Sequence, residues 1–316
     1  ELKAINNKLT GTLTLNDVTV ALSGSSADVA AALAGTFAAT YTGTATLSDN
    51  HTLAELVAIN NGTTGNITLN SNAVALSGST SDVKAALAGN VGAAYSGNIT
   101  LTDANGTSIA ATDITTIESD TTGTITVSNN IRLTGTAAQV AAAVDDVNTF
   151  SGTPTATLSN AHTLAELKAI NNKLSGTLTL GDYTVALSGS TADVKAALAG
   201  NFASTYTGDV NILDAHTTNI NATDITTIAG DTSGTVTVSY NIDINGTAAA
   251  VATAVGNAVF VGSPTATLTD AHTLAELKTI NNAIRGGITL GDYTVALSGS
   301  SADVAAALDG SFASTY

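Results

Sequence analysis

Three histidines occupy the same place in similar stretches of the chain: His51, His162 and His272. One of these stretches is "HTLAELKAINNKLSGTLTLGDYTVALSG", at residues 162–189. Imidazole and carboxylate groups together are typical metal ligands, and Asp270 lies two residues before the last histidine. The matching residues in the other copies are Asp49 and Asn160, and one histidine in about 110 residues is few for a ligand set. We therefore expect polar residues flanking helix starts, with a metal site as the alternative.

Aspartates recur in two positions of the repeated stretches. One set lies in a turn between two expected strands, where a carboxylate bonds local backbone amides. The other set follows a later strand. Stacked repeats would align such residues into rows of oxygen ligands, which suit calcium. Calcium is the one cofactor hypothesis that the sequence supports. The turn set is Asp17, Asp182 and Asp292, and the second set is Asp49, Asp103, Asp214 and Asp270.

A third group of acids lies three residues after a Thr or Ser, and this spacing is typical of helix caps. The two arginines, Arg132 and Arg285, lie in non-equivalent places without a cluster of acids and bases around them. No carboxylate pair stands out for hydrolysis, and we expect no enzyme activity. The capping acids are Glu55, Glu166, Glu276, Asp28, Asp193 and Asp303.

The elements that must position these residues can be predicted from the stretch at 162–200. Thr163 and Glu166 form a capping box that begins a helix, and residues 164, 167 and 170 form its apolar face. Asn171, Asn172 and Gly176 are expected to end it. Residues 177–180 alternate as a half-buried strand, and a turn at 181–182 leads to a second strand over 183–187. A second helix begins at Ser190 and ends at Gly200. The two strands form either a hairpin or a corner.

The whole chain is a series of such stretches. Six repeats of 52–58 residues come into register when Glu1, Glu55, Asp113, Glu166, Asp224 and Glu276 are aligned. Each contains two similar halves of about 27 residues, the size of one solenoid turn. The sequence predicts an α/β repeat fold, an elongated βα solenoid with short Thr-rich strands and two short Ala/Leu-rich helices per repeat. The repeats span 1–54, 55–112, 113–165, 166–223, 224–275 and 276–316.

Composition narrows the classes of partner. Nine basic and twenty-five acidic residues give a net charge of −16, so nucleic acid and anionic membrane surfaces are poor partners. The chain has no cysteine, which is compatible with export but does not establish it. The uncharged stretch Val29–Ser48 is rich in Ala, Thr and Gly, and it is too polar to span a bilayer.

The segment Ser108–Val144, "SIAATDITTIESDTTGTITVSNNIRLTGTAAQVAAAV", carries a resemblance. It resembles the repeats of giant secreted or cell-surface proteins of marine cyanobacteria and other aquatic bacteria. The resemblance covers nearly the whole chain through motifs of low complexity. It implies an extracellular or cell-surface protein with a structural, adhesive or motility-related role, and it implies no catalytic residues. The chain lacks the glycine-rich calcium nonapeptides found in many relatives.

Three functions follow as hypotheses. The first is the structural repeat region of a long extracellular filament or surface protein, whose open ends meet copies of the chain or adjoining repeats. The second is an adhesin stalk or a module that binds surfaces or cell-surface glycans. It would need an exposed patch that breaks the repeat, and Phe150 and Phe260, near Pro154 and Pro264, are its only hint. The third and weakest is a carbohydrate-active solenoid enzyme.

Overall fold

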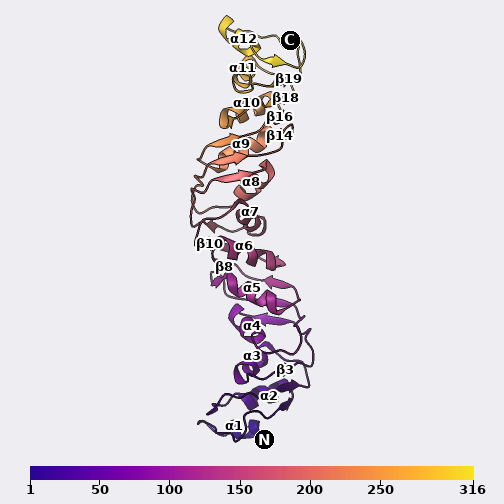
Figure 1. The fold of residues 1–316 in the computed structure, drawn as a ribbon, viewed down its shortest axis with the longest axis vertical. Coiled ribbons are helices and arrows are strands. Elements are labelled where there is room, and N and C mark those ends of the chain that lie inside the picture. Colours follow the sequence, from indigo (N-terminus) through magenta and orange to yellow (C-terminus); the bar gives the residue numbers. More distant parts are fainter. The chain divides into compact units, whose positions relative to one another are not determined.

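The computed structural model describes residues 1–316 and alternates short helices with short strands. Contacts divide the chain into two compact units, Glu1–Thr157 and Leu158–Tyr316, which we call the N-terminal unit and the C-terminal unit. Within each unit the helices follow one another in chain order, and each packs against the next (Figure 1). The helices of the N-terminal unit are α1 (Leu2–Asn6), α2 (Ser26–Leu33), α3 (Leu53–Gly62), α4 (Thr80–Leu87), α5 (Ala111–Asp120) and α6 (Ala137–Asp146).

The helices of the C-terminal unit are eight or ten residues long, as are those of the N-terminal unit apart from the five-residue α1. They are α7 (Leu164–Lys173), α8 (Thr191–Leu198), α9 (Ala222–Asp231), α10 (Ala248–Asn257), α11 (Leu274–Ala283) and α12 (Ser301–Leu308). Helix α8 begins 111 residues after α4, and α9 begins 111 residues after α5. The two units therefore repeat the same series of segments. No helix combines the length and apolar character that crossing a bilayer requires.

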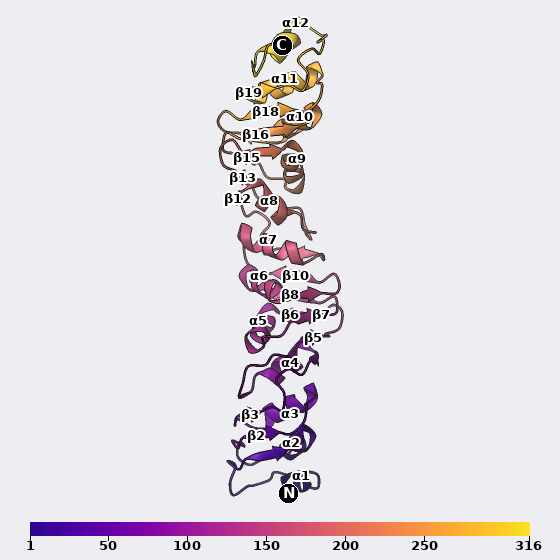
Figure 2. The same cartoon turned by 90° about the vertical axis from the view of Figure 1, so that its right-hand side faces the viewer.

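The strands are two to four residues long and lie beside the helices, as Figure 2 shows for β5 to β8 next to α5 and α6. The strands from the start of the chain to the boundary between the units are β1 (Leu22–Gly24), β2 (Ala45–Leu47), β3 (Ile67–Thr68), β4 (Leu76–Gly78), β5 (Ile99–Leu101), β6 (Ser108–Ala110), β7 (Ile125–Val127), β8 (Arg132–Gly135), β9 (Thr149–Phe150) and β10 (Thr155–Leu158).

The remaining strands belong to the C-terminal unit. They are β11 (Leu178–Thr179), β12 (Leu187–Gly189), β13 (Val210–Ile212), β14 (Asn219–Asn221), β15 (Val236–Val238), β16 (Asp243–Gly246), β17 (Val259–Phe260), β18 (Thr265–Leu268), β19 (Gly287–Thr289) and β20 (Ser311–Phe312).

Neighbouring strands come from consecutive segments and run parallel, as in the sheets β4-β5-β7-β9 and β12-β13-β15-β17. A parallel pair needs a crossover, and each short helix supplies one. Helices pack about 8–10 Å apart and strands about 4.8 Å apart. With one helix for each strand, a row of helices is therefore longer than the sheet it covers, which is one physical reason for small sheets of three to five strands. The fold is an α/β protein of alternating parallel strands and helices, with repeated βα segments.

The core is an apolar layer between helices and strands, and it follows the predicted periodicities. Leu167 and Ile170 of α7 are buried, as are Val194, Ala197 and Leu198 of α8. The small alanine allows close packing of neighbouring helices. In β11, Leu178 is buried while Thr179 is exposed, as the alternation predicts.

Two local predictions are wrong. Residues 183–186 form no strand, and β12 begins only at Leu187. Strands β11 and β12 belong to different sheets, so residues 180–186 form a corner and not a hairpin. Asn171 does not end its helix but lies within α7, and its side chain donates to Ala197 O near the end of α8. In the sequence, an asparagine whose side chain bonds a carbonyl of the neighbouring helix cannot be distinguished from one that ends its own helix.

Candidate functional site

The three histidines lie buried in the core, each bonded to a tyrosine of the following segment. In the C-terminal unit, His162 precedes α7 and Tyr206 follows α8; His162 Nε2 lies 3.1 Å from the phenol oxygen. His51 with Tyr95 and His272 with Tyr316 show the same distance. The histidines are only 3–4% exposed. They directly precede the capping threonines, so they flank helix starts as expected, but they are core residues.

The phenol hydrogens decide the histidine tautomer. The Tyr206 hydroxyl donates to Val185 O at 2.5 Å, and the hydroxyl of Tyr316 donates to Val295 O at 2.7 Å. A phenol has one hydrogen, so each histidine donates from Nε2 and leaves Nδ1 unprotonated. Nδ1 is buried without a hydrogen-bond partner in all three histidines. Burial lowers the pKa of each histidine, and nearby carboxylates such as Glu166 oppose the effect. The pairs therefore hold neutral imidazoles that join neighbouring segments.

The aspartates that follow a strand bond the first helical residue of the preceding segment. Asp103 Oδ2 accepts from Thr80 N at 2.9 Å and from its hydroxyl at 2.6 Å. Asp214 accepts in the same way from Thr191, at 2.8 and 2.5 Å. Asp49 accepts from Ser26 N and Asp270 from Ala248 N, at 2.7 and 2.8 Å. Each carboxylate satisfies an amide at the positive end of a helix dipole.

The turn aspartates have local partners only. Asp182 Oδ1 accepts from Thr184 N and Oγ1, both at 2.8 Å, and this bonding lowers its pKa. Asp17 and Asp292 repeat the arrangement with the threonine two residues on. No three His, Asp or Glu side chains come together in a way that could hold a metal ion. The structure thus places both aspartate sets at backbone amides and brings no three of these side chains together at one metal site.

The capping acids act as the sequence predicts. Thr163 and Glu166 form a complete capping box, as do the matching residues of α3 and α11. Asp28, Asp193 and Asp303 are each the third residue of a helix, and the serine that precedes the helix accepts from the aspartate amide. Five lysines pair with such aspartates one segment away, for example Lys278 Nζ with Asp303 Oδ1 at 2.5 Å. The side chains of these pairs are between 31% and 56% exposed, so each pair adds little stability. The other four are Lys3–Asp28, Lys84–Asp113, Lys168–Asp193 and Lys195–Asp224.

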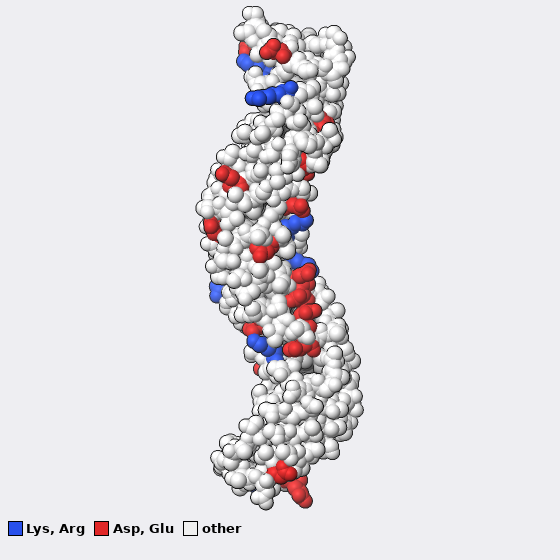
Figure 3. All heavy atoms as spheres, viewed as in Figure 1, with Lys and Arg blue, Asp and Glu red and all other residues white.

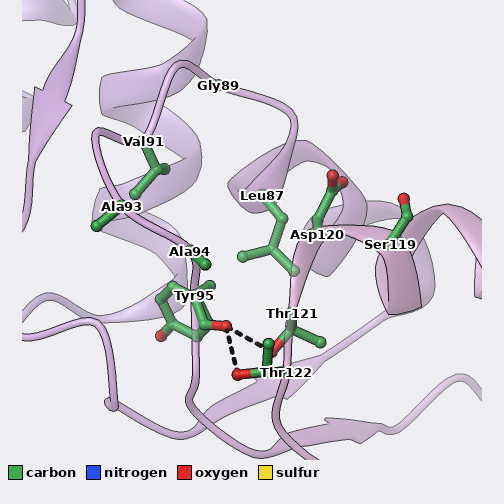
Figure 4. A pocket seen from close by; sticks show the side chains of 10 residues that line it. All are labelled: Leu87, Gly89, Val91, Ala93, Ala94, Tyr95, Ser119, Asp120, Thr121 and Thr122. Carbon is green, nitrogen blue, oxygen red and sulfur yellow. Dashed lines mark hydrogen bonds between the residues drawn. The ribbon is translucent and has the colours of Figure 1, made fainter.

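An open hollow of about 250 Å³ lies between the ends of α4 and α5 (Figure 4). The threonine hydroxyls of residues 121 and 122 donate to the Tyr95 carbonyl oxygen, at 3.3 and 3.4 Å. Burial raises the pKa of Asp120 on its rim, but none of the residues that line the hollow is a basic partner for this carboxyl group. A similar hollow beside Tyr41 lies between α2 and α3. Because the hollow recurs, it is a feature of segment packing.

Carboxylates gather over the ends of α5 and α6 in the N-terminal unit (Figure 3). Glu118 and Asp145 lie near Asp146, and burial together with these two charges raises the pKa of Asp146. Acids at a helix C-terminus oppose the dipole, so this cluster costs stability at neutral pH. No cation lies beside it among the ion pairs.

The remaining candidates are spread along the chain. Arg132 begins β8 and Arg285 follows α11, and both are exposed. Phe150 and Phe260 end the matching strands β9 and β17 and are half-buried. The sequence interpretation missed the tyrosine partners of the histidines. The signal was present, because each tyrosine follows its histidine by 44 residues.

The geometry therefore shows recurring bonds between consecutive segments. Comparison of the chain with models of known protein families, with curated proteins and with solved structures finds no match.

Proposed function

We propose that the chain is the structural repeat region of a long extracellular filament or cell-surface protein, built by end-to-end stacking of repeats. In this proposal the βα segments form a solenoid whose open ends meet copies of the chain or adjoining repeats. No catalytic activity is part of the proposal. The resemblance to giant repeat proteins of aquatic bacteria supports the extracellular location.

The bonds between consecutive segments carry this proposal. A carboxylate caps the helix of the preceding segment, an asparagine bonds the end of the following helix, and a histidine reaches a tyrosine 44 residues on. These polar groups are satisfied only when the next segment is in place. Repeat proteins take their stability from such neighbour contacts, so a further segment at either end extends an interface that already exists.

Electron microscopy of the purified chain tests the proposal. The net charge of −16 opposes association at low salt, and at about 0.5 M salt the screening length falls to about 4 Å. We expect fibres of uniform width with a regular axial repeat at high salt and separate particles at low salt. Separate particles under both conditions, at concentrations up to the solubility limit, would contradict end-to-end assembly.

A second candidate, the adhesin or glycan-binding module, is favoured by one specific observation. Three large hydrophobic side chains on either side of α10 in the sequence, Tyr240, Val259 and Val261, are between 39% and 53% exposed. The N-terminal unit has polar residues at the matching positions. Imaging distinguishes the two candidates, because an adhesin predicts single stalks with a distinct tip.

A further inference from the structure

The loop after β13 departs from its counterpart in the other unit. Helices α5 and α9 begin 111 residues apart, so the loops that precede them, 102–107 and 213–218, occupy matched places. At three neighbouring positions the residue types differ between the units. His216, Thr217 and Tyr240 of the C-terminal unit correspond to Asn105, Gly106 and Asn129 of the N-terminal unit.

The N-terminal version forms well-bonded local structure. Asn105 Oδ1 accepts from Asn130 N at 2.9 Å. Gly106 has a φ of +79°, a left-handed conformation that glycine adopts without strain. Asn129 Nδ2 donates to the Asp103 carbonyl at 2.8 Å and to the preceding carbonyl at 3.3 Å. These residues are sufficient to build the loop.

The matching loop of the C-terminal unit, residues 213–218, lacks part of this stabilising hydrogen bonding. His216 Nδ1 replaces the asparagine oxygen but lies 3.4 Å from Asn241 N. Thr217 has a φ of +65° and is the only residue besides glycine with a positive φ. A β-branched residue in this conformation costs about 1–2 kcal/mol. Strain that the fold does not require points to a function at that place.

The substitutions create an exposed pair of aromatic rings. The ring centroids of His216 and Tyr240 lie 5.0 Å apart, closer than in any other ring pair of the chain. His216 is exposed, and Tyr240 is 39% exposed. The pairing of β15 with β17 aligns Val238 with Phe260, so the exposed Val261 lies one residue beyond this pair. Its counterpart in the N-terminal unit is Ser151.

The size and surroundings of the patch select one class of ligand. A stable protein interface buries about 800 Å² on each partner, and besides Leu308 on α12 the exposed large hydrophobics of this unit are Tyr240, Val259 and Val261. A sugar ring needs less, because its apolar face packs on an aromatic ring while its hydroxyls bond polar neighbours. Thr217 and Asn241 are exposed beside the rings. The net charge of −16 repels uronate and sulfate groups.

We propose that His216 and Tyr240 form a binding platform for a neutral polysaccharide, with Thr217 and Asn241 bonding its hydroxyl groups. This inference rests on the second candidate function and names its ligand class. It does not depend on filament assembly, because His216, Thr217 and Tyr240 take no part in the histidine–tyrosine, asparagine or carboxylate bonds between segments described above. Asn241 Oδ1 accepts from Ser263 N at 2.7 Å, so the Asn241 group that bonds the ligand is Nδ2.

Affinity electrophoresis of the whole chain tests the proposal, in native gels containing galactomannan or dextran, and alginate as the anionic contrast. We expect retardation by at least one neutral polymer and none by alginate. H216N/Y240N installs the asparagines of the N-terminal unit, so it should fold, with a circular dichroism melting temperature no lower than that of the wild type. Its dissociation constant for that polymer should rise about tenfold, as the loss of two ring contacts predicts. The reverse variant, N105H/N129Y, places a second platform in the N-terminal unit and should increase retardation.

Three results would overturn the proposal. The first is that neither neutral polymer retards the wild-type chain in the gel. The second is that H216N/Y240N binds the neutral polymer as tightly as the wild type does. The third is that sedimentation shows self-association of the wild type but not of H216N/Y240N, because the rings would then form a contact between copies of the chain. Fibre formation by H216N/Y240N is measured separately, so failure of the platform and failure of the filament proposal remain distinguishable.

Discussion

Replacing Tyr206 by phenylalanine should destabilise the C-terminal unit more than a single lost hydrogen bond predicts. The ring remains and fills the same space, so only the hydroxyl is lost. This hydroxyl accepts from His162 Nε2 and donates to Val185 O. Both partners become unsatisfied, and His162 is buried and already has an unpartnered Nδ1. A buried unsatisfied group costs about 1–3 kcal/mol, so the expected loss is about 2–4 kcal/mol.

The chain contains a matched control for this variant. Tyr41 occupies the equivalent place in the second segment, is equally buried, and donates to Val20 O. No histidine contacts its hydroxyl among the hydrogen bonds of the chain. Tyr41→Phe should therefore cost about 1–2 kcal/mol. The difference between the two variants isolates the bond to His162.

Urea unfolding followed by circular dichroism measures both losses, and hydrogen exchange of residues 164–210 locates the effect, since a repeat protein need not unfold as one unit. Adding His162→Leu to Tyr206→Phe removes the unsatisfied imidazole and should recover part of the stability. Equal losses for Tyr206→Phe and Tyr41→Phe would refute the reasoning, and so would a double variant that is less stable than Tyr206→Phe alone.

Three further predictions concern pH, the cross-segment carboxylates and one glycine. Burial lowers the folded-state pKa of the three paired histidines below the unfolded value of about 6.5. Their contribution to the free energy of unfolding is therefore complete above pH 6.5 and is lost as the pH falls through 6.5 toward the folded pKa. Urea midpoints at pH 7.5 and 5.5 should show this decline, and glutamine at all three positions should abolish it. Asp214→Ala removes the hydrogen bonds to the start of α8 and should cost about 0.5–2 kcal/mol of stability. Asp182→Ala removes bonds within a surface turn only and should change stability by less than about 0.5 kcal/mol. Similar losses for the two variants in thermal unfolding would show that the cross-segment bond is unimportant. A Cβ on Gly62 would lie 2.5 Å from the Leu33 Cβ, so Gly62→Ala should cost about 1–3 kcal/mol of stability in urea unfolding. The opposite change at the matching position, Ala283→Gly, should cost about 1 kcal/mol or less. A stabilised Gly62→Ala variant would show that Leu33 moves aside freely.

The sequence by itself determined the features that depend on residues a few positions apart. The capping box of Thr163 and Glu166 needs only a spacing of three, and the buried stripe of Leu167 and Ile170 follows from helical periodicity. The internal repetition likewise predicted alternating strands and helices. Each of these signals is local, so no knowledge of the neighbouring segment is needed to interpret it.

Only the tertiary structure decided which segments complete each other. Residues 183–186 alternate like a strand, yet no neighbour pairs with them, and a strand requires a partner. Asp103 and Asp182 are both aspartates near turns, but the first bonds a helix 23 residues away and the second bonds its own turn. The sequence predicted that His162 flanks a helix start but not that it is buried, because its tyrosine partner lies 44 residues ahead. Side chains bond according to distance in space, which the stacking of segments sets and spacing along one segment does not.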